Sequence, residues 1–292
     1  MNILITGGTG FLGRSLCSAL MAQGHAVTVL SRQRAAKVQQ LCGCKVTPRA
    51  DLATWQQGEF FDAVVNLAGA PVFDRPWSVA RKALLWESRV GFTQRLVARL
   101  AASCQPPQVL LSASAIGIYG DQGDCVLTED SEPSADFLGR LCSAWEASAM
   151  AAGERGVRVC SLRTGLVLHA SGGILHRMLL PFRCGLGARL GDGRQWMSWI
   201  GLEDWVGLVL RLLEDGRATG AYNLTAPHPV TNAEFTSALA KSVRRPAWAV
   251  APACLLRGFL GERASMLLGS QRALPQKATS LGYGFKKEKL KF

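Results

Sequence analysis

The sequence predicts an α/β fold, a doubly wound parallel sheet with a smaller C-terminal subdomain. Short apolar runs alternate with amphipathic helical segments over the first two-thirds of the 292 residues, as they do in such sheets. A glycine-rich turn joins the first run to the first helix. After about Gly165 the alternation stops, and a stretch rich in Gly and Arg follows. We therefore expect a sheet domain over residues 1–165, with core strands up to about residue 225 as the alternative, and a distinct region over residues 166–292.

The expected strands and helices follow from hydrophobic periodicity and from Gly and Pro boundaries. A strand covered on both faces is a short apolar run, whereas a helix needs apolar residues every three or four positions. The first helix ends at Gly24, and residues 185–194 are expected to form a long loop. The expected strands are residues 3–6, 26–31, 63–67, 108–112, 157–162 and 222–224, and the expected helices are residues 11–23, 80–103, 138–152, 200–214, 233–242 and 254–260.

Composition narrows the class of protein. Hydrophobic residues make up 48% and charged residues 18% of the chain, which is typical of a soluble globular protein. No apolar run reaches the roughly 20 residues that cross a bilayer, so we expect no membrane partner. The chain begins with a strand-like run rather than a secretory signal, and we expect a cytoplasmic protein. Nine cysteines without two ligand pairs at zinc spacing predict reduced thiols and no metal site.

The formal net charge of +12 is concentrated in two places. Residues 1–50 contain six basic residues and no acidic one, in the region that holds the glycine-rich turn. A second cluster, residues 286–291, is expected to be a solvated tail. Neither cluster is interleaved with aromatic residues that could stack on bases, so we expect no nucleic-acid partner.

Gly7, Gly10 and Gly13 are spaced three apart between the first strand and the first helix. In such a turn the first glycine permits the tight bend, the second lets the backbone approach a pyrophosphate, and the third lets helix and strand pack closely. The N–H groups at the start of the helix, around Phe11 and Leu12, then face the phosphates. The pattern predicts a dinucleotide site in a Rossmann-like fold, and a glycine-rich turn without a ligand is the alternative.

The end of the second strand indicates which dinucleotide is bound. NAD sites usually place Asp or Glu there to accept a hydrogen bond from the ribose 2′-hydroxyl. Here the strand ends in Ser31 and Arg32, followed by Arg34, and Asp51 is the first acidic residue of the chain. Because arginine binds a 2′-phosphate that a carboxylate would repel, we expect NADP(H) rather than NAD(H). The alternative is that both arginines are solvated surface charges.

Several segments, together with the glycine loop, resemble the extended short-chain dehydrogenase/reductase superfamily over most of the chain. Asn66-Leu67-Ala68-Gly69 is similar to the superfamily's signature beside the cofactor, and Asp51-Leu52 is similar to its residue pair near the adenine. Ser112-Ala113-Ser114 with Tyr119 is similar to the segment that carries the catalytic Ser or Thr. Residues 163–167 are similar to the segment beside the nicotinamide. A closer match, to an atypical branch labelled the NAD-dependent epimerase family, includes residues 181–187, 191–195 and 269–275.

The resemblance implies an oxidoreductase or epimerase with a small-molecule substrate of unknown identity. It also implies that NADP contacts Ser31, Arg32, Leu67, Ala68, Arg89 and Val167, with Gly69 beside them. For Arg89, a surface salt bridge is the alternative.

The superfamily's proton-transfer pair is missing from this chain. That pair is Tyr-x-x-x-Lys on the helix after the fifth strand, where the lysine and the nicotinamide ribose lower the tyrosine pKa. In the usual register Leu138 and Cys142 occupy the two positions. Tyr283 precedes Lys287 by four residues, but at the C-terminal end and far from the expected helix.

Three interpretations remain open. In the first, the protein is an enzyme in which Ser114 orients the substrate carbonyl and Tyr119, Cys142 or Arg140 supplies the proton. In the second, it is a sensor or interaction module that binds NADP(H) without turnover. In the third, it is a structural protein that has kept the fold and lost the ligand, and the intact glycine loop argues against this.

Overall fold

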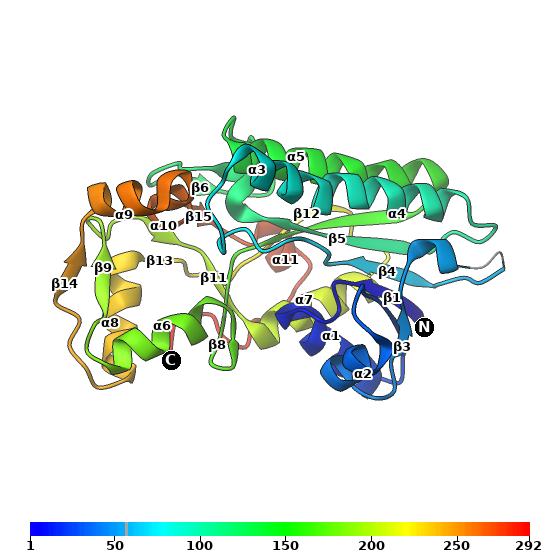
Figure 1. The fold of residues 1–292 in the computed structure, drawn as a ribbon, viewed down its shortest axis with the longest axis horizontal. Helices are drawn as coiled ribbons and strands as arrows, with labels where there is room; N and C mark the ends of the chain where they lie inside the picture. Colours follow the sequence, from blue (N-terminus) through cyan, green and yellow to red (C-terminus); the bar gives the residue numbers. More distant parts are fainter. Residues whose placement is uncertain (56–57) are drawn as a thin grey trace.

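The computed structural model, which describes residues 1–55 and 58–292, contains a central sheet of seven parallel strands (Figure 1). The strands are β1 (Asn2–Thr6), β2 (Ala26–Leu30), β3 (Thr47–Arg49), β4 (Ala63–Asn66), β5 (Val109–Ala115), β7 (Arg158–Thr164) and β12 (Gly220–Leu224). Their order is β12-β7-β5-β4-β1-β2-β3. The chain therefore winds outward from β1 in one direction and from β4 in the other, which confirms the predicted doubly wound sheet. Because β12 comes after residue 165, both predicted regions contribute strands to the sheet.

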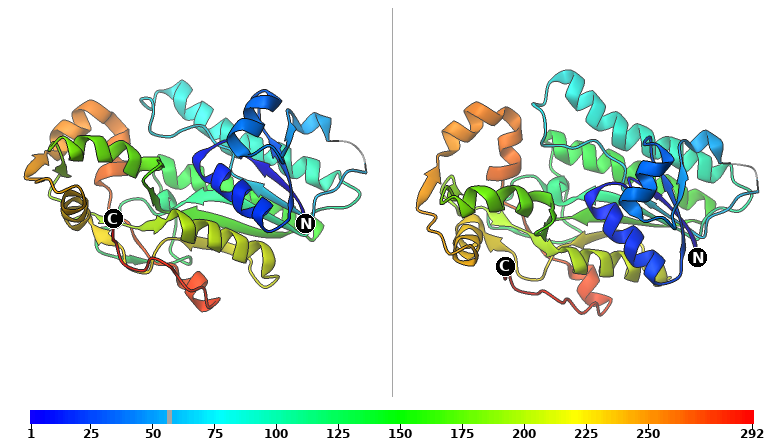
Figure 2. Two further views of the ribbon diagram at one scale, coloured as in Figure 1. Left: turned by 90° about the horizontal axis from the view of Figure 1, so that it is seen from below. Right: turned by 60° about the horizontal axis from the view of Figure 1, so that its bottom comes forward.

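Helices cover both faces of this sheet (Figures 1 and 2). One layer consists of α1 (Phe11–Ala22), α2 (Ala35–Cys42) and α7 (Leu202–Glu214), and the other of α3 (Val79–Trp86), α4 (Phe92–Ala101) and α5 (Phe137–Met150). Ile3 and Ile5 of β1 lie in the apolar cluster of the first layer, and Leu4 lies in that of the second. This two-sided burial is why the strands are continuous apolar runs. No helix in residues 1–55 and 58–292 combines the length and apolarity that crossing a membrane requires.

The expected single helix over residues 80–103 is divided into three consecutive parts. A π-helical turn, η2 (Glu87–Gly91), joins α3 to α4 without a break in the helical path. Gly91, the last residue of this turn, lies against the carboxylate end of the Glu87 side chain. Such turns insert one extra residue and turn the following side chains, and they are frequent at functional sites. Here the turn carries Arg89.

The smaller C-terminal region forms around a separate apolar cluster that includes Trp199, Phe235 and Leu239. Its elements are β8 (Leu166–His169), α6 (Gly173–Arg183), β9 (Ala188–Leu190), β10 (Trp196–Met197), β11 (Trp199–Gly201), β13 (Val230–Thr231), α8 (Asn232–Ser242), β14 (Ala249–Ala251), α9 (Ala253–Leu260) and α10 (Ser265–Leu268). Residues 185–194, expected to be a loop throughout, contain β9, which pairs with β14. Periodicity did not identify β9 because a strand of three half-buried residues has too few positions to show alternation.

Near the C-terminus the chain returns to the sheet and is held there. Short helix α11 (Gln276–Ser280) follows β15 (Arg272–Ala273), which pairs with β6 (Val126–Leu127), and the last residues then run past α7 (Figure 2). The buried Asp204 of α7 accepts backbone N–H bonds from Lys286 (2.7 Å) and Lys287 (3.0 Å). The expectation of a solvated tail was wrong for the backbone, although the lysine side chains are exposed.

Candidate functional site

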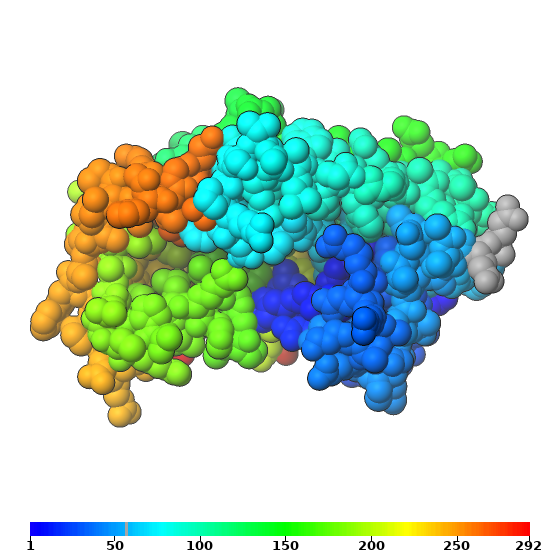
Figure 3. Space-filling model, viewed as in Figure 1, coloured from blue at the N-terminus to red at the C-terminus, as the bar shows by residue number. Residues whose placement is uncertain are grey.

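Residues that the sequence assigns to a cofactor meet at one edge of the sheet. Thr6 at the end of β1 is paired with Leu30 of β2 on one side and with Asn66 of β4 on the other. The residues that follow these three are Gly7, Ser31 and Leu67. The strand order reverses between β1 and β4, and ligands of doubly wound sheets bind outside the carboxyl ends at that point. In the space-filling view this surface is hollowed between the dark blue, cyan and green segments (Figure 3).

The glycine loop forms a concave backbone surface, and side chains at its glycine positions would fill or distort it. Gly7 has φ +69°, and a Cβ there would lie 2.5 Å from the carbonyl oxygen of Leu67. A Cβ on Gly13 would lie 2.5 Å from the carbonyl oxygen of Gly7. Helix α1 begins after Gly10 with no side-chain cap, so its first N–H groups are left for another acceptor. The loop therefore fits the pyrophosphate of a dinucleotide.

Phe11, Leu12 and Val167 lie together just behind the loop. Phe11 and Leu12, at the start of α1, pack against the apolar cluster to which Val167 of β8 belongs. The Phe11 ring also fills the space where a Cβ on Gly172 would be. This contact joins the start of α1 to the residues between β8 and α6, at the start of the C-terminal region.

The residues beyond β2 and β3 lie at the same edge. Ser31 is half-buried, and its hydroxyl accepts the N–H of Gln33 (3.2 Å). Arg32 is exposed and has no ion pair with any residue that the structure describes. Asp51 uses its carboxylate to cap the short helix that begins at Leu52, accepting the N–H of Ala53 (3.1 Å). No carboxylate therefore neutralises the arginine at the end of β2.

Arg89 is a half-buried cation without a carboxylate partner among the described residues. Its Nη2 donates to the carbonyl of Ala70 (3.0 Å), and its guanidinium lies 5.2 Å from the ring of Trp145. A Cβ on Gly69 would contact it at 3.0 Å. Burial lowers the pKa of Arg89. The structure therefore does not contain the surface salt bridge that was the alternative for Arg89. A cation at this position without a carboxylate partner among the described residues is available to bind a phosphate group.

A buried network fixes the segment after β4. The hydroxyl of Thr6 donates to Asn66 Oδ1 (2.6 Å) and accepts the N–H of Ala68 (3.2 Å). Asn66 Nδ2 donates to the hydroxyl of Thr93 (2.8 Å), which also accepts the indole N–H of Trp145 (3.0 Å). All of these side chains are buried. The network holds Leu67 and Ala68 rigidly beside Gly7.

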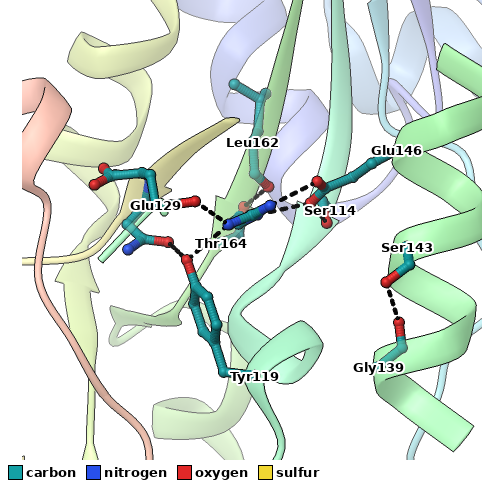
Figure 4. A network of polar contacts seen from close by, with 10 residues as sticks. Ser114, Tyr119, Glu129, Gly139, Ser143, Glu146, Leu162 and Thr164 are labelled. Atoms are coloured by element: carbon teal, nitrogen blue, oxygen red, sulfur yellow. Dashed lines mark hydrogen bonds and ion pairs between the residues drawn. The ribbon is translucent and has the colours of Figure 1, made fainter. Parts of the chain in front are cut away.

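The segment expected to be catalytic lies in a second buried network (Figure 4). Ser114 donates its hydroxyl to Glu146 Oε1 (2.6 Å). Arg163 binds the same carboxylate through Nε and Nη2, both at 2.9 Å, and donates from Nη1 to the hydroxyl of Tyr119 (3.0 Å). Burial by itself would lower the pKa of Arg163, but the hydrogen bonds and charge of Glu146 outweigh it and raise that pKa. The pair is a bidentate ion pair that is largely shielded from water.

Tyr119 and Cys142 are both enclosed. Tyr119 has no exposed surface, and its hydroxyl donates to Asn223 Oδ1 (2.7 Å). Burial raises the pKa of Tyr119, and burial raises the pKa of the Cys142 thiol to about 12. Arg140, the remaining candidate donor, is exposed and binds the carbonyl of Ala135. Ser114 is 4% exposed and lies at the carboxyl end of β5, beside the cleft.

Sequence reasoning missed the acidic and amide members of this network. Glu129 accepts the backbone N–H of Asn223 (3.0 Å), and Asn223 Nδ2 donates to the carbonyl of Leu274 (2.9 Å). Glu146 is likewise not among the site residues that the sequence predicts. A signal was present, because Arg163 lies within an apolar strand and a buried cation requires a partner. The identity of that partner depends on the packing of β7 against α5.

A cavity of about 320 Å³ lies next to Leu138, where the superfamily's tyrosine would be. Residues 117–121, which follow β5, and the start of α5 form one wall, and α9, α10 and the residues between them form the other. The charged residues that line it are Asp121, Asp136, Glu262 and Arg257. Glu262 is also paired with Lys82 of α3 (2.6 Å). The cavity is large enough for a small polar molecule. Within residues 1–55 and 58–292, no group of three or more His, Cys, Asp or Glu side chains could hold a metal ion.

Comparisons with known proteins agree with this architecture. A model of the NAD dependent epimerase/dehydratase family matches residues 3–225, and a domain of unknown function, DUF1731, matches residues 251–291. An epimerase family protein of Mycobacterium bovis is 39% identical over 97% of this chain and 93% of its own length. A homologue in Arabidopsis thaliana, named as chloroplastic, is 38% identical over 98% of this chain and 83% of its own length. The cytoplasmic location that we expected stays a prediction.

Solved structures extend the similarity to three dimensions. The crystal structure of human epimerase family protein SDR39U1 with NADPH has a TM-score of 0.89 and 32% identity, covering 99% of this chain and 96% of that one. A nucleoside-diphosphate sugar epimerase from Corynebacterium glutamicum has a TM-score of 0.78 and 31% identity, covering 99% of this chain and 56% of that one.

Proposed function

The chain belongs to the NAD dependent epimerase/dehydratase family, and from this premise we propose that it binds NADP(H) and exchanges hydride with a small-molecule substrate. The observation that carries the proposal is the glycine loop at the carboxyl ends of β1 and β4, with Arg32 and Arg89 beside it and no carboxylate paired to either among the described residues. The human relative crystallised with NADPH supports the choice of cofactor.

Each part of the cofactor has a matching group in this chain. The first N–H groups of α1 would bind the pyrophosphate, and Arg32 would bind the 2′-phosphate. Asp51 and Leu52 would lie beside the adenine, and Leu67, Ala68, Gly69 and Val167 would border the part of the site that holds the nicotinamide. The bound cofactor supplies the hydride, and the protein positions the substrate and provides the proton.

Ser114 is the candidate that best fits the reacting end of the site. Its proton is directed to Glu146, so its oxygen lone pairs are available to accept from a substrate hydroxyl. The cavity beside Leu138 would hold the remainder of the substrate. Tyr119 is a weaker candidate, because its hydroxyl is enclosed between Asn223 and Arg163.

A second function is favoured by one specific observation. Leu138 and the enclosed Cys142 stand at the two positions of the proton-transfer pair, and neither can supply a proton near neutral pH. A protein with this site could bind NADP(H) and report its presence without turning it over.

The test is a titration of the purified protein with NADPH and NADH, followed by a screen of carbonyl substrates on the same sample. Tight binding of NADPH and its oxidation by a substrate would establish the enzyme. Tight binding without oxidation across a broad screen would favour the sensor, and no binding of either nucleotide would refute both.

Arg32→Asp tests the choice between the two nucleotides. Because the substitution replaces a cation by a carboxylate at the 2′-phosphate, we expect NADPH affinity to fall by about tenfold or more, and NADH affinity to fall much less. Titration of both nucleotides into Arg32→Asp and into the matched control Arg34→Asp measures this. Equal losses for NADPH and NADH would show that Arg32 does not read the phosphate.

A further inference from the structure

A second cavity, of about 530 Å³, lies in the C-terminal region. It is enclosed by α8, by β9 and by residues 244–250, which lead into β14. These elements lie at the end of the molecule away from α1 and α2, so the cavity is separate from the glycine loop (Figure 1). Its charged lining residues are Arg189, Lys241, Arg244 and Arg245, and no Asp or Glu lines it.

Two buried polar groups in the lining have no hydrogen-bond partner among residues 1–55 and 58–292. Thr236 is 3% exposed, and its hydroxyl forms no hydrogen bond. The Nε–H of Arg189 is also buried and without a hydrogen bond. Buried polar atoms in folded proteins are nearly always hydrogen-bonded, so each exception calls for an explanation. A hydroxyl and a guanidinium both donate hydrogen bonds, so what each of these groups lacks is an acceptor.

The charge of the lining identifies that acceptor as an anion. None of the four cations forms an ion pair with a residue in the described part of the chain. Lys241 and Arg244 lie at the C-terminal end of α8, where the helix dipole favours cations. The dipole does not explain the unpaired groups of Thr236 and Arg189, which come from the middle of α8 and from β9.

Arg244 adopts a left-handed backbone conformation that is unfavourable for residues other than glycine. Its φ is +54°, and no other non-glycine residue among those described has a positive φ. The N–H of Arg245 donates to the carbonyl of Ala240 (3.0 Å), which closes the end of α8. Helices that end in this way usually have glycine at the position that Arg244 occupies. An arginine there places a further guanidinium at the cavity, where glycine would leave none.

We propose that this cavity binds a small organic phosphate about the size of a mononucleotide. The phosphate accepts from Thr236 and Arg189 and is neutralised by Lys241 and Arg244. Trp248, which is 90% exposed and lines the cavity, covers the flat apolar part of the ligand. The volume lies within the range of pockets that hold such molecules.

The test is calorimetric titration of AMP into the full-length protein, with NADPH in excess so that the glycine loop is not free to bind the probe. We expect one AMP site, weakened about tenfold by Lys241→Gln and by Arg244→Gly. Arg244→Gly is informative because glycine suits φ +54°, so a loss of binding with an unchanged or higher melting temperature cannot come from misfolding. Arg155→Gln, which removes an exposed charge beyond α5, is the matched control and should leave AMP binding unchanged.

Two further arms identify the ligand. Inorganic phosphate should bind more weakly than AMP, and Trp248→Ala should remove most of that difference. Equal binding of phosphate and AMP would overturn the organic part of the proposal. Absence of AMP binding, or affinity unchanged in both Lys241→Gln and Arg244→Gly, would overturn the site itself. Titration of NADPH into Lys241→Gln and Arg244→Gly, which lie away from the glycine loop, distinguishes failure of this site from failure of the proposed function.

Discussion

At the scale of single residues, Arg163 and Glu146 form an ion pair at the centre of the polar network around Ser114. The two side chains are 9% and 13% exposed, so water screens their interaction little. Ser114, Tyr119 and the carbonyl of Glu129 all bind to this pair. A buried ion pair adds little to stability relative to apolar residues, but removing one partner leaves an uncompensated charge.

Arg163→Met should therefore lower the free energy of unfolding by about 3–5 kcal/mol. The double variant Arg163→Met/Glu146→Met should recover most of the loss, because it leaves no buried charge. Urea denaturation measures both. The control is Arg95→Met, which breaks an exposed pair with Glu87 and should cost less than about 1 kcal/mol. If the double variant were no more stable than Arg163→Met, the uncompensated charge would not be the cause.

The Cys142 thiol makes stability depend on alkaline pH. Burial raises the pKa of Cys142 from 9.0 to about 12, so the folded protein keeps a proton that the unfolded chain releases above pH 9. Its contribution to stability is therefore complete below pH 9 and is lost as the pH rises from 9 to about 12. In that range the free energy of unfolding of Cys142→Ala should fall less steeply with pH than that of the unmodified protein. The difference between the two slopes should be up to about 1.4 kcal/mol per pH unit. Denaturation curves at pH 8, 9 and 10 measure the slope, and identical slopes for the two proteins would contradict the assignment.

Among the elements, α1 depends on the close approach of its first turn to the glycine loop. Gly13→Ala places a methyl group 2.5 Å from the Gly7 carbonyl oxygen and from the Gly8 Cα, and backbone atoms cannot move aside as a side chain can. We expect a loss of about 1–3 kcal/mol in stability and a loss of NADPH binding. Gly258→Ala in α9, where a Cβ meets nothing within 4 Å, is the matched control and should keep both. Normal NADPH affinity in a well-folded Gly13→Ala protein would mean that the cofactor does not lie on this loop.

The elements also differ in how far the sequence predicts them. Six of the seven strands of the central sheet were predicted, because covering both faces leaves a largely apolar run in each. The edge strand β3 was not predicted, because Thr47-Pro48-Arg49 is not an apolar run. The π-turn at Glu87–Gly91 was not predicted, because it adds one residue inside a continuous helical run and no Pro marks its position. Strand β9 was missed because its three residues are half-buried and only β14 supplies its partner.

At the level of the whole molecule, the C-terminal segment connects α7 to the smaller region. Asp204 holds the backbone at Lys286 and Lys287, and the ring of Phe292 packs edge-on against Phe235 of α8, with centroids 5.2 Å apart. The segment thus crosses from the sheet domain to the C-terminal cluster. Its basic side chains stay in solvent while its backbone is fixed.

Asp204→Ala should release this segment. The two N–H groups would lose their acceptor, and we expect trypsin to cleave after Lys286 and Lys287 several times faster than in the unmodified protein, with little change elsewhere. Mass spectrometry of timed digests measures the rates. Glu214→Gln removes an exposed carboxylate at the other end of α7 and should leave cleavage unchanged. Equal rates in Asp204→Ala and Glu214→Gln would show that Asp204 does not anchor the segment.

The sequence by itself determined the features that local spacing encodes. Apolar runs fixed the strands, the three-residue glycine spacing fixed the loop at the end of β1, and the absence of acidic residues before Asp51 indicated the cofactor. Only the tertiary structure decided which distant groups meet. Tyr119 and Asn223 are 104 residues apart, and Arg163 finds Glu146 because β7 packs against α5. The unpaired Thr236 and Arg189 likewise become a site only where α8 faces β9. Hydrogen bonds and ion pairs act over a few ångströms, whereas periodicity along the chain sets only which face each residue occupies.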